Sequence, residues 1–372
     1  MKILYIGHYK EQSGWSNAAI NAIRALNTTD LDVVCRNIKL TDNPVSIPDD
    51  IKQLENKDLQ NIDYCIQHVL PHHLTGTDKF KKNIAYFVNE LDSIKYHHWY
   101  QNLELMDEVW VPNKDSKENL IKDNFSENKI KIIPHAFNID KYIDDNKRIV
   151  FDDKQHAFKF YFICEINDRK NLESIIRCFH SEFHTNEPVS LILKLKKTGI
   201  NSTDLRNGII KFCDDIKTQM RLYSDIKDYH HEIIITEDFT DEQMKILHQS
   251  CDCFVGPTHG EGWGIPAFDA MCYGKTPICS KEGGPKDYID PNNRNTGWLI
   301  NGIYGICNHR NAAFHDLFTG NNHWFIPDEL EIKSAMRYYY TNHNLKNKDG
   351  IEQGERFSYI NVGNMIKGAL ND

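Results

Sequence analysis

Short apolar runs of strand length alternate with helical stripes along nearly the whole chain. The runs predicted as strands cover residues 2–7, 32–35, 63–68, 83–88, 108–111 and 129–134 in the first half, and 158–165, 190–194, 232–236, 253–256 and 276–279 in the second. Buried parallel strands flanked by helices produce this alternation. The pattern therefore predicts an α/β protein with two successive sheets.

Helical spacing of apolar residues follows the first predicted strand of each half. The two stripes comprise Trp15, Ala19, Ala22, Ile23 and Leu26, and then Leu172, Ile175, Ile176, Phe179 and Phe183. Thr240 followed by Gln243 predicts a capping box at the start of another helix. The last stretch, 357–370, is amphipathic and predicts a closing helix.

A polar, charged segment at 140–156 interrupts the alternation. A chain of 372 residues is long enough for about two domains. We therefore predict a first domain of residues 1–150 and a second of residues 151–354, with this segment as the exposed connection. A solvated loop within a single domain is the alternative.

Charge and cysteine usage narrow the class of protein. Lys and Arg number 44 and Asp and Glu 53, so the net charge is 44 − 53 = −9, which excludes a dedicated basic nucleic-acid binder. No apolar run approaches the length of a membrane span, and the N-terminal run is too short for a signal peptide. The ten cysteines contain no C-x-x-C pair, which favours thiols in the cytoplasm over disulfides or zinc ligands.

Residues 257–277 read as a strand, a glycine-rich loop, a helix and the start of another strand. Glycines let the backbone approach a ligand closely, and Pro266 suits the first turn of a helix because its missing amide costs nothing there. The free amides before it form a site for an anion such as phosphate. The residues predicted to bind it are Gly262, Trp263, Gly264, Ile265 and Pro266.

Two carboxylates flank this turn, Glu261 in the loop and Asp269 about one turn into the helix. Carboxylates repel phosphate but accept hydrogen bonds from sugar hydroxyls well. A nucleotide sugar offers a diphosphate for the amides and diols for the acids. The same spacing also allows a purely structural role, in which Glu261 caps the helix and Asp269 neutralises its dipole.

Residues 261–278 resemble the E-x7-E signature of retaining glycosyltransferases with the GT-B fold, of the family 4 type. The matching positions are Glu261-Gly262-x-Gly264, Asp269-Ala270-Met271 and Gly274-x-x-Pro277-Ile278. The chain departs from the signature in having Asp as the second acid and one extra residue before Pro277. The resemblance implies that Glu261 contacts the donor sugar and Asp269 the nucleotide ribose, with a reach shorter by one methylene.

The segment 167–172 resembles the R-K-N segment of the same family, with Glu165 where many members have Arg. The resemblance implies that Lys170, together with Arg169, holds the donor diphosphate; a surface pair at a helix start is the alternative. Gly283 and Gly284 resemble the paired glycines that pass close to the donor sugar.

The first half resembles the acceptor side of the family. Ser13, Gly14 and Trp15 stand in the loop after the first strand, with one glycine where members often have two. Trp15 can stack on a sugar ring or join the buried helical stripe. His68, at the end of a strand, is the candidate for the histidine near the reacting carbon, or else a structural histidine. Glu90 follows another strand and is a candidate acceptor contact.

The resemblance implies a GT-B architecture, with two Rossmann-like domains facing a central cleft and a C-terminal helix, at about 355–372, crossing back to the first domain. We predict that the second domain binds a nucleotide-diphosphate sugar and the first binds the acceptor. Retention of configuration needs no protein nucleophile, because the donor phosphate oxygen can take the acceptor proton. No metal or other cofactor is expected.

The acceptor stays open among a glycan, a lipid-linked saccharide and a hydroxymethylated DNA base of a phage-type genome. Peripheral contact with a membrane is also left open. Two other readings compete with the transferase. One is a catalytically silent sugar-nucleotide-binding or scaffold protein, and the other is a sugar-nucleotide epimerase or phosphorylase of the same fold.

Overall fold

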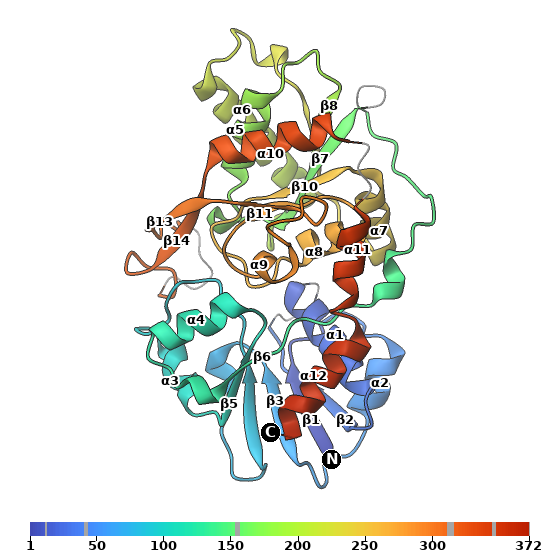
Figure 1. Ribbon diagram of the computed structural model, residues 1–372, viewed down its shortest axis with the longest axis vertical. Helices are drawn as coiled ribbons and strands as arrows, with labels where there is room; N and C mark the ends of the chain where they lie inside the picture. Colours follow the sequence, from blue (N-terminus) through green and yellow to red (C-terminus); the bar gives the residue numbers. More distant parts are fainter. Residues whose placement is uncertain (12, 41–43, 153–156, 311–315, 344–346, 372) are drawn as a thin grey trace. The chain divides into compact units, whose positions relative to one another are not determined.

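The computed structural model describes residues 1–11, 13–40, 44–152, 157–310, 316–343 and 347–371 (Figure 1). The chain forms two compact units. The first contains residues 1–139 together with 355–372, and the second contains residues 140–354. Each unit is built around one parallel six-stranded sheet. The alternation of apolar runs predicted the two sheets and all of their strands except Trp298–Ile300 in the second unit.

The sheet of the first unit has the strand order β2-β1-β3-β4-β5-β6. Its strands are β1 (Lys2–Gly7), β2 (Asp32–Asn37), β3 (Tyr64–His68), β4 (Lys82–Tyr86), β5 (Glu108–Val111) and β6 (Ile130–Ile132). Its helices are α1 (Gly14–Asn27), α2 (Asp49–Glu55), α3 (His98–Glu104), α4 (Lys114–Lys122) and α12 (Tyr359–Asn371), with short 3₁₀ turns η1 (Pro71–His73) and η2 (Glu127–Lys129). The bounds of β1 and β5 are those predicted.

The closing helix α12 packs on α1 of the first unit. Val362 and Ile366 join the buried core that Ala22 and Ile23 of α1 help to form. A side chain at Gly363 would not fit, because its Cβ would lie 2.3 Å from the carbonyl oxygen of Ala25. This close packing assigns the C-terminal helix to the first unit and confirms that prediction.

The sheet of the second unit has the order β12-β11-β10-β7-β8-β9. Its strands are β7 (Phe158–Glu165), β8 (Val189–Lys196), β9 (Glu232–Ile235), β10 (Cys253–Gly256), β11 (Ile278–Ser280) and β12 (Trp298–Ile300). Its helices are α5 (Leu172–Glu182), α6 (Ser202–Met220), α7 (Asp241–Ser250), α8 (Ile265–Cys272), α9 (Pro285–Tyr288), α10 (Glu329–Thr341) and α11 (Lys348–Glu355), with 3₁₀ turns η3 (Ile139–Tyr142), η4 (Asp168–Lys170) and η5 (Ile226–Asp228).

The capping box and the helical stripe that the sequence predicted in the second unit are both present. The Gln243 amide N–H donates to Oγ1 of Thr240 at 3.2 Å, and Oε1 of Gln243 accepts from the Thr240 amide at 2.8 Å, which completes the capping box that begins α7. The helical stripe of α5 is buried at Leu172, Ile175 and Phe179.

A hairpin in the second unit was not predicted. It consists of β13 (Gly302–Ile306) and β14 (His323–Pro327), which pair antiparallel (Figure 1). Most of β13 is exposed although it contains Ile303, Tyr304 and Ile306, and only Trp324 and Phe325 of β14 are well buried among its large side chains. Neither strand alternates apolar and polar residues, so periodicity did not reveal them.

The boundary between the units falls after Ile139, earlier than the expected break at residue 150. Lys141 and Tyr142 of η3 both hydrogen-bond Asp269 of α8, so the chain joins the second unit within η3. Residues 143–148 are exposed, as expected of a connection. Residues 153–156 of the same segment lie outside the described residues.

Candidate functional site

In the second unit, β7 is flanked by β8 on one side and by β10 on the other. Strand order reverses between β7 and β10, and in open α/β sheets ligands bind outside the carboxyl ends of the strands at such a switch point. The turn η4 follows β7, and the glycine-rich loop 257–264 follows β10. The sheet thus places both predicted donor-binding segments at one edge.

Lys170 and Glu261 form an ion pair at this switch point. Nζ of Lys170 lies 2.6 Å from Oε2 of Glu261, and the two side chains are 17% and 15% exposed. The guanidinium of Arg169 lies 3.6 Å from the same oxygen and donates a hydrogen bond to the carbonyl oxygen of Gly260. Glu261 is therefore held by both cations, and it stands where an anion is best stabilised.

The charge state of Glu261 follows from these neighbours. Burial by itself would raise the pKa of the Glu261 carboxyl. The charges of Lys170 and Arg169, with hydrogen bonds from Lys170 and from the Gly264 amide, outweigh burial and hold the pKa below its ordinary value. Glu261 is thus a carboxylate at neutral pH.

Helix α8 begins at this loop. Gly264 is its N-cap and has φ of +81°, a left-handed conformation in which glycine is favoured. Ile265 and Pro266 form the first helical turn, where Pro266 removes no intrahelical hydrogen bond. A pocket in the second unit is lined by Lys170, Glu261, Gly264 and Pro266. The pocket thus brings together the cation, the carboxylate and the helix start.

Gly283 and Gly284 pass against the backbone of the glycine-rich loop. A Cβ at Gly283, which has φ of +88°, would lie 2.2 Å from the carbonyl oxygen of Glu261, and a Cβ at Gly284 would lie 2.3 Å from Cα of Trp263. The Gly284 amide donates to the Glu261 carbonyl oxygen at 2.9 Å. These glycines are needed to pack one loop on the other, whatever else they contact.

Asp269, the second acid of the signature, makes contacts that the sequence did not indicate. Its Oδ1 accepts hydrogen bonds from the Tyr142 hydroxyl at 2.5 Å and from Nζ of Lys141 at 2.8 Å. Glu165, where the family often has Arg, accepts instead from the amide and hydroxyl of Thr198, at 3.1 and 2.6 Å.

In the first unit the reversal of strand order lies between β1 and β3, where Gly7 is in register with His68. His68 is fully buried; its Nδ1 lies 2.6 Å from the hydroxyl of Tyr5, and its ring stacks on Tyr86 at 4.4 Å. Burial, followed by the proximity of His135 and His8, holds the pKa of His68 well below its ordinary value. Nε2 has no hydrogen-bond partner among the described residues. A neutral, buried imidazole thus lies at the switch point, and Nε2 is its nitrogen without a hydrogen bond to the described residues.

The other predicted residues of the first unit lie at the start of α1 and in the loop after β4. Ser13 is the N-cap of α1, accepting from the Ser16 amide at 3.3 Å, and Gly14 is exposed as the first residue of that helix. The ring of Trp15 is half-buried with its centroid 5.4 Å from that of His68. Glu90 is half-buried in the loop after β4.

Tyr142 and His259 were missed as site residues by the sequence analysis. Tyr142 lies in the charged stretch that was taken as a connection, and only the fold brings it to Asp269. His259 lies two residues before Glu261, inside the segment 257–277. Its closeness to Glu261 in the sequence could have marked it as a candidate site residue.

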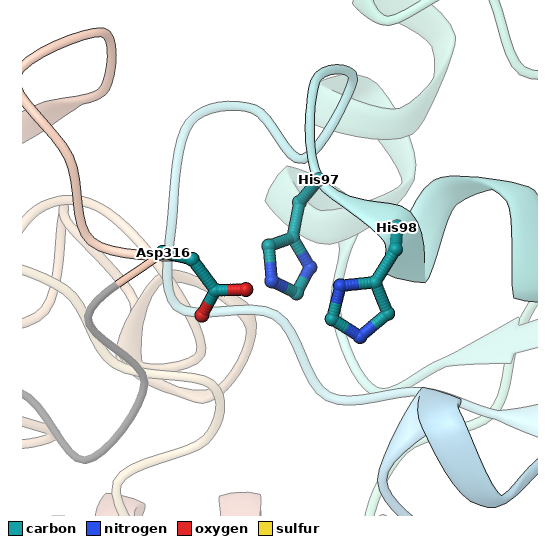
Figure 2. Close-up of side chains that lie close together, drawn as sticks. All are labelled: His97, His98 and Asp316. Carbon is teal, nitrogen blue, oxygen red and sulfur yellow. The ribbon is translucent and has the colours of Figure 1, made fainter.

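Figure 2 shows His97 and His98 next to each other at the start of α3, with ring centroids 4.0 Å apart. Nδ1 of His97 accepts from the Trp99 amide at 3.3 Å, so this imidazole caps the helix. Asp316, also drawn there, belongs to the second unit. Within the first unit this pair offers two imidazoles, fewer than the three protein ligands typical of a catalytic zinc site.

Two parallel-sheet Rossmann-like units, each with polar residues gathered at a reversal of strand order, define the GT-B class of glycosyltransferase folds. Residues 144–302 match the family described as Glycosyl transferases group 1. The match and the fold together support a GT-B glycosyltransferase. No curated protein sequence matches the chain.

Solved structures share the whole architecture at low sequence identity. HepE of Anabaena, crystallised with UDP-glucose, is 13% identical with a TM-score of 0.64, covering 100% of this chain and 99% of that one. Sucrose-phosphate synthase of Thermosynechococcus elongatus is 14% identical with a TM-score of 0.62, covering 100% and 98%. The lipopolysaccharide outer core galactosyltransferase WaaB is 12% identical with a TM-score of 0.62, covering 100% and 99%.

The structure also shows the state of the cysteines and the character of the helices. All ten cysteines are thiols, and all but Cys164 are buried. Of the helices in the described ranges, none combines the length and apolar character that crossing a bilayer requires.

Proposed function

We propose that this protein is a retaining glycosyltransferase that moves a sugar from a nucleotide-diphosphate sugar to an acceptor hydroxyl. The observation that carries the proposal is the Lys170–Glu261 pair beside the N-terminus of α8, at the switch point of the second unit. The second unit is the donor-binding domain, and the first unit binds the acceptor.

The chemistry of the donor site follows from its charges. On donor binding, Lys170 and the amides at the start of α8 face the diphosphate, and the carboxylate of Glu261 accepts hydrogen bonds from sugar hydroxyls. As the bond from the anomeric carbon to the phosphate oxygen breaks, negative charge grows on the diphosphate, and preorganised cations and amides stabilise it most at that moment. Lys170, Arg169 and these amides supply that stabilisation, so we propose that no divalent metal is required.

Retention follows when the acceptor attacks from the face that the diphosphate leaves. The acceptor hydroxyl oxygen forms the new bond to the anomeric carbon, and its proton passes to the departing phosphate oxygen. His68, neutral and buried at the switch point of the first unit, is proposed to donate or accept one hydrogen bond through Nε2 to the reacting sugars. Ser13, Gly14, Trp15 and Glu90 are the proposed acceptor contacts.

The nucleotide is proposed to be UDP, because HepE was crystallised with UDP-glucose and with UDP. The acceptor is proposed to be a saccharide, free or lipid-linked, with a hydroxymethylated DNA base as the other class. The thiol state of the cysteines favours the cytoplasm as the location.

A catalytically silent binding protein is the second candidate. The engagement of Asp269 by Tyr142 and Lys141 favours it, because the carboxylate that the family signature assigns to the ribose already has two partners.

The deciding experiment incubates the protein with UDP-, GDP- and ADP-sugars and a mixed saccharide acceptor pool, with mass spectrometry of the products. We expect a glycosylated product with the anomeric configuration of the donor by NMR, and undiminished turnover in EDTA. Glu261→Gln should lower transfer by about 10²-fold or more, while UDP affinity holds or improves because Lys170 loses its partner. Nucleotide binding without turnover by the wild-type protein would establish the silent protein instead.

A further inference from the structure

The hairpin of β13 and β14 has no part in the mechanism above, yet it is fastened to the donor site. The family match ends at residue 302, where β13 begins, so the hairpin lies beyond the matched segment. Its inner residues, Trp324 and Phe325, are 8% and 4% exposed. Both contact His259, two residues before Glu261.

His259 is held by the hairpin through its backbone, its imidazole and its ring face. The Phe325 amide donates to the His259 carbonyl oxygen at 2.9 Å, and Nδ1 of His259 lies 2.7 Å from the Phe325 carbonyl oxygen. A carbonyl only accepts, so Nδ1 carries a proton. The indole of Trp324 stacks on the imidazole, with centroids 4.3 Å apart and an interplanar angle of 24°.

His259 in turn touches the loop that carries the cations. Its amide donates to the carbonyl oxygen of Arg169 at 2.8 Å. The chain that follows β13 makes a second attachment there, because the Arg310 amide donates to Oδ2 of Asp168 at 2.7 Å. The hairpin and its flank therefore brace both loops between which the Lys170–Glu261 pair forms.

The glycine-rich loop needs contacts of this kind to hold one backbone conformation. Gly260, Gly262 and Gly264 give it backbone freedom that costs entropy to restrain. Displacement of a reacting group by about 1 Å can cost about 10²-fold in rate. An aromatic stack of this geometry supplies a fixed contact next to the loop without a flexible side chain.

We propose that Trp324 is a positioning residue of the donor site, which acts through the stack on His259 to fix Glu261 relative to Lys170. The inference rests on the proposed function for its catalytic consequence, but its structural part is independent of it. Trp324 itself touches neither donor nor acceptor in this scheme.

The test compares Trp324→Ala with Trp324→Phe, which keeps a ring for stacking. Ile306→Ala is the matched control, because Ile306 lies on the same hairpin and is 67% exposed. Hydrogen exchange is measured for the amides of 259–264 in the ligand-free protein, and kcat and KM are measured for transfer from the donor found above.

In Trp324→Ala we expect exchange at 259–264 to rise at least tenfold, and kcat to fall about tenfold or more with the acceptor KM unchanged. Trp324→Phe should keep both the exchange rates at 259–264 and kcat close to their wild-type values. Ile306→Ala should resemble the wild type. Unchanged exchange at 259–264 would overturn the proposal, as would exchange that rises equally in the core strands β7, β8 and β10, which would indicate general destabilisation. If the wild-type protein transfers no sugar, the proposed function fails, and the exchange measurement still decides the positioning.

Discussion

Nζ of Lys170 lies 2.6 Å from Oε2 of Glu261, although 91 residues separate them in the chain. Because its partner is a single carboxylate, the ammonium group of Lys170 can exchange this internal ion pair for an ion pair with a bound anion. Under the proposed function, a bound diphosphate gives Lys170 a stronger anion than the one it holds, and the carboxylate of Glu261 turns to the sugar.

Lys170→Met should weaken the binding of UDP by about 2 kcal/mol, or roughly 30-fold in Kd, because it removes a charged hydrogen bond to phosphate. Isothermal calorimetry measures the loss. Lys211→Met on α6 is the control, since Lys211 is exposed and its removal should leave Kd unchanged. Equal affinity in Lys170→Met and wild type would remove Lys170 from the phosphate site.

Asp269 can be tested separately from its partners. Asp269→Asn should weaken UDP binding roughly tenfold, because a charged acceptor for ribose hydroxyls is lost, while the affinity for inorganic pyrophosphate should stay the same. Tyr142→Phe removes the 2.5 Å hydrogen bond but keeps the carboxylate, so UDP binding should persist while unfolding becomes easier by about 1 kcal/mol. If both variants lose only stability, Asp269 is a structural anchor for the connection.

The paired glycines give a packing prediction. Gly284→Ala should lower the free energy of unfolding by about 3 kcal/mol, because the new Cβ would lie 2.3 Å from Cα of Trp263 and the loops would have to separate. Gly208→Ala is the matched control: Gly208 lies within α6 with open space around it, so the same change should stabilise by about 0.5–1 kcal/mol. Urea unfolding of the two variants decides the point, and similar stabilities would contradict the close approach.

Two buried histidines, one in each unit, predict acid sensitivity. Burial lowers the pKa of His135 to about 4, and that of His248 to about 4, from an ordinary 6.5. As pH falls below 6.5 the unfolded chain takes up these protons first, so stability is complete above about pH 7 and is lost progressively toward pH 4. At pH 5, each of these two histidines should lower the free energy of unfolding by about 2 kcal/mol.

The measurement is the free energy of unfolding in urea at pH 7, 6 and 5. His135→Asn should reduce the loss between pH 7 and pH 5, since it removes one of the histidines whose pKa is lowered. His231→Asn, a change at an exposed position, is the control and should leave the curve as it is. An identical pH dependence in His135→Asn and wild type would contradict the assignment.

Much of the architecture was predictable because its signals are local. Continuous apolar runs mark buried parallel strands, and the bounds of β1, β5, β7 and β10 were obtained from them. The glycine-rich turn and Pro266 indicated the start of α8 from residue chemistry alone. The hairpin was missed because its two five-residue strands do not alternate apolar and polar residues.

The sequence by itself determined the α/β class, the order of the predicted strands and which residue types stand at their ends. Only the tertiary structure decided which of them meet: Lys170 with Glu261, Tyr142 with Asp269, and Trp324 with His259. The physical reason is that such pairings depend on the order of strands within a sheet. Local periodicity fixes each strand, but the adjacency of β7 and β10 comes from the packing of the whole unit around its core.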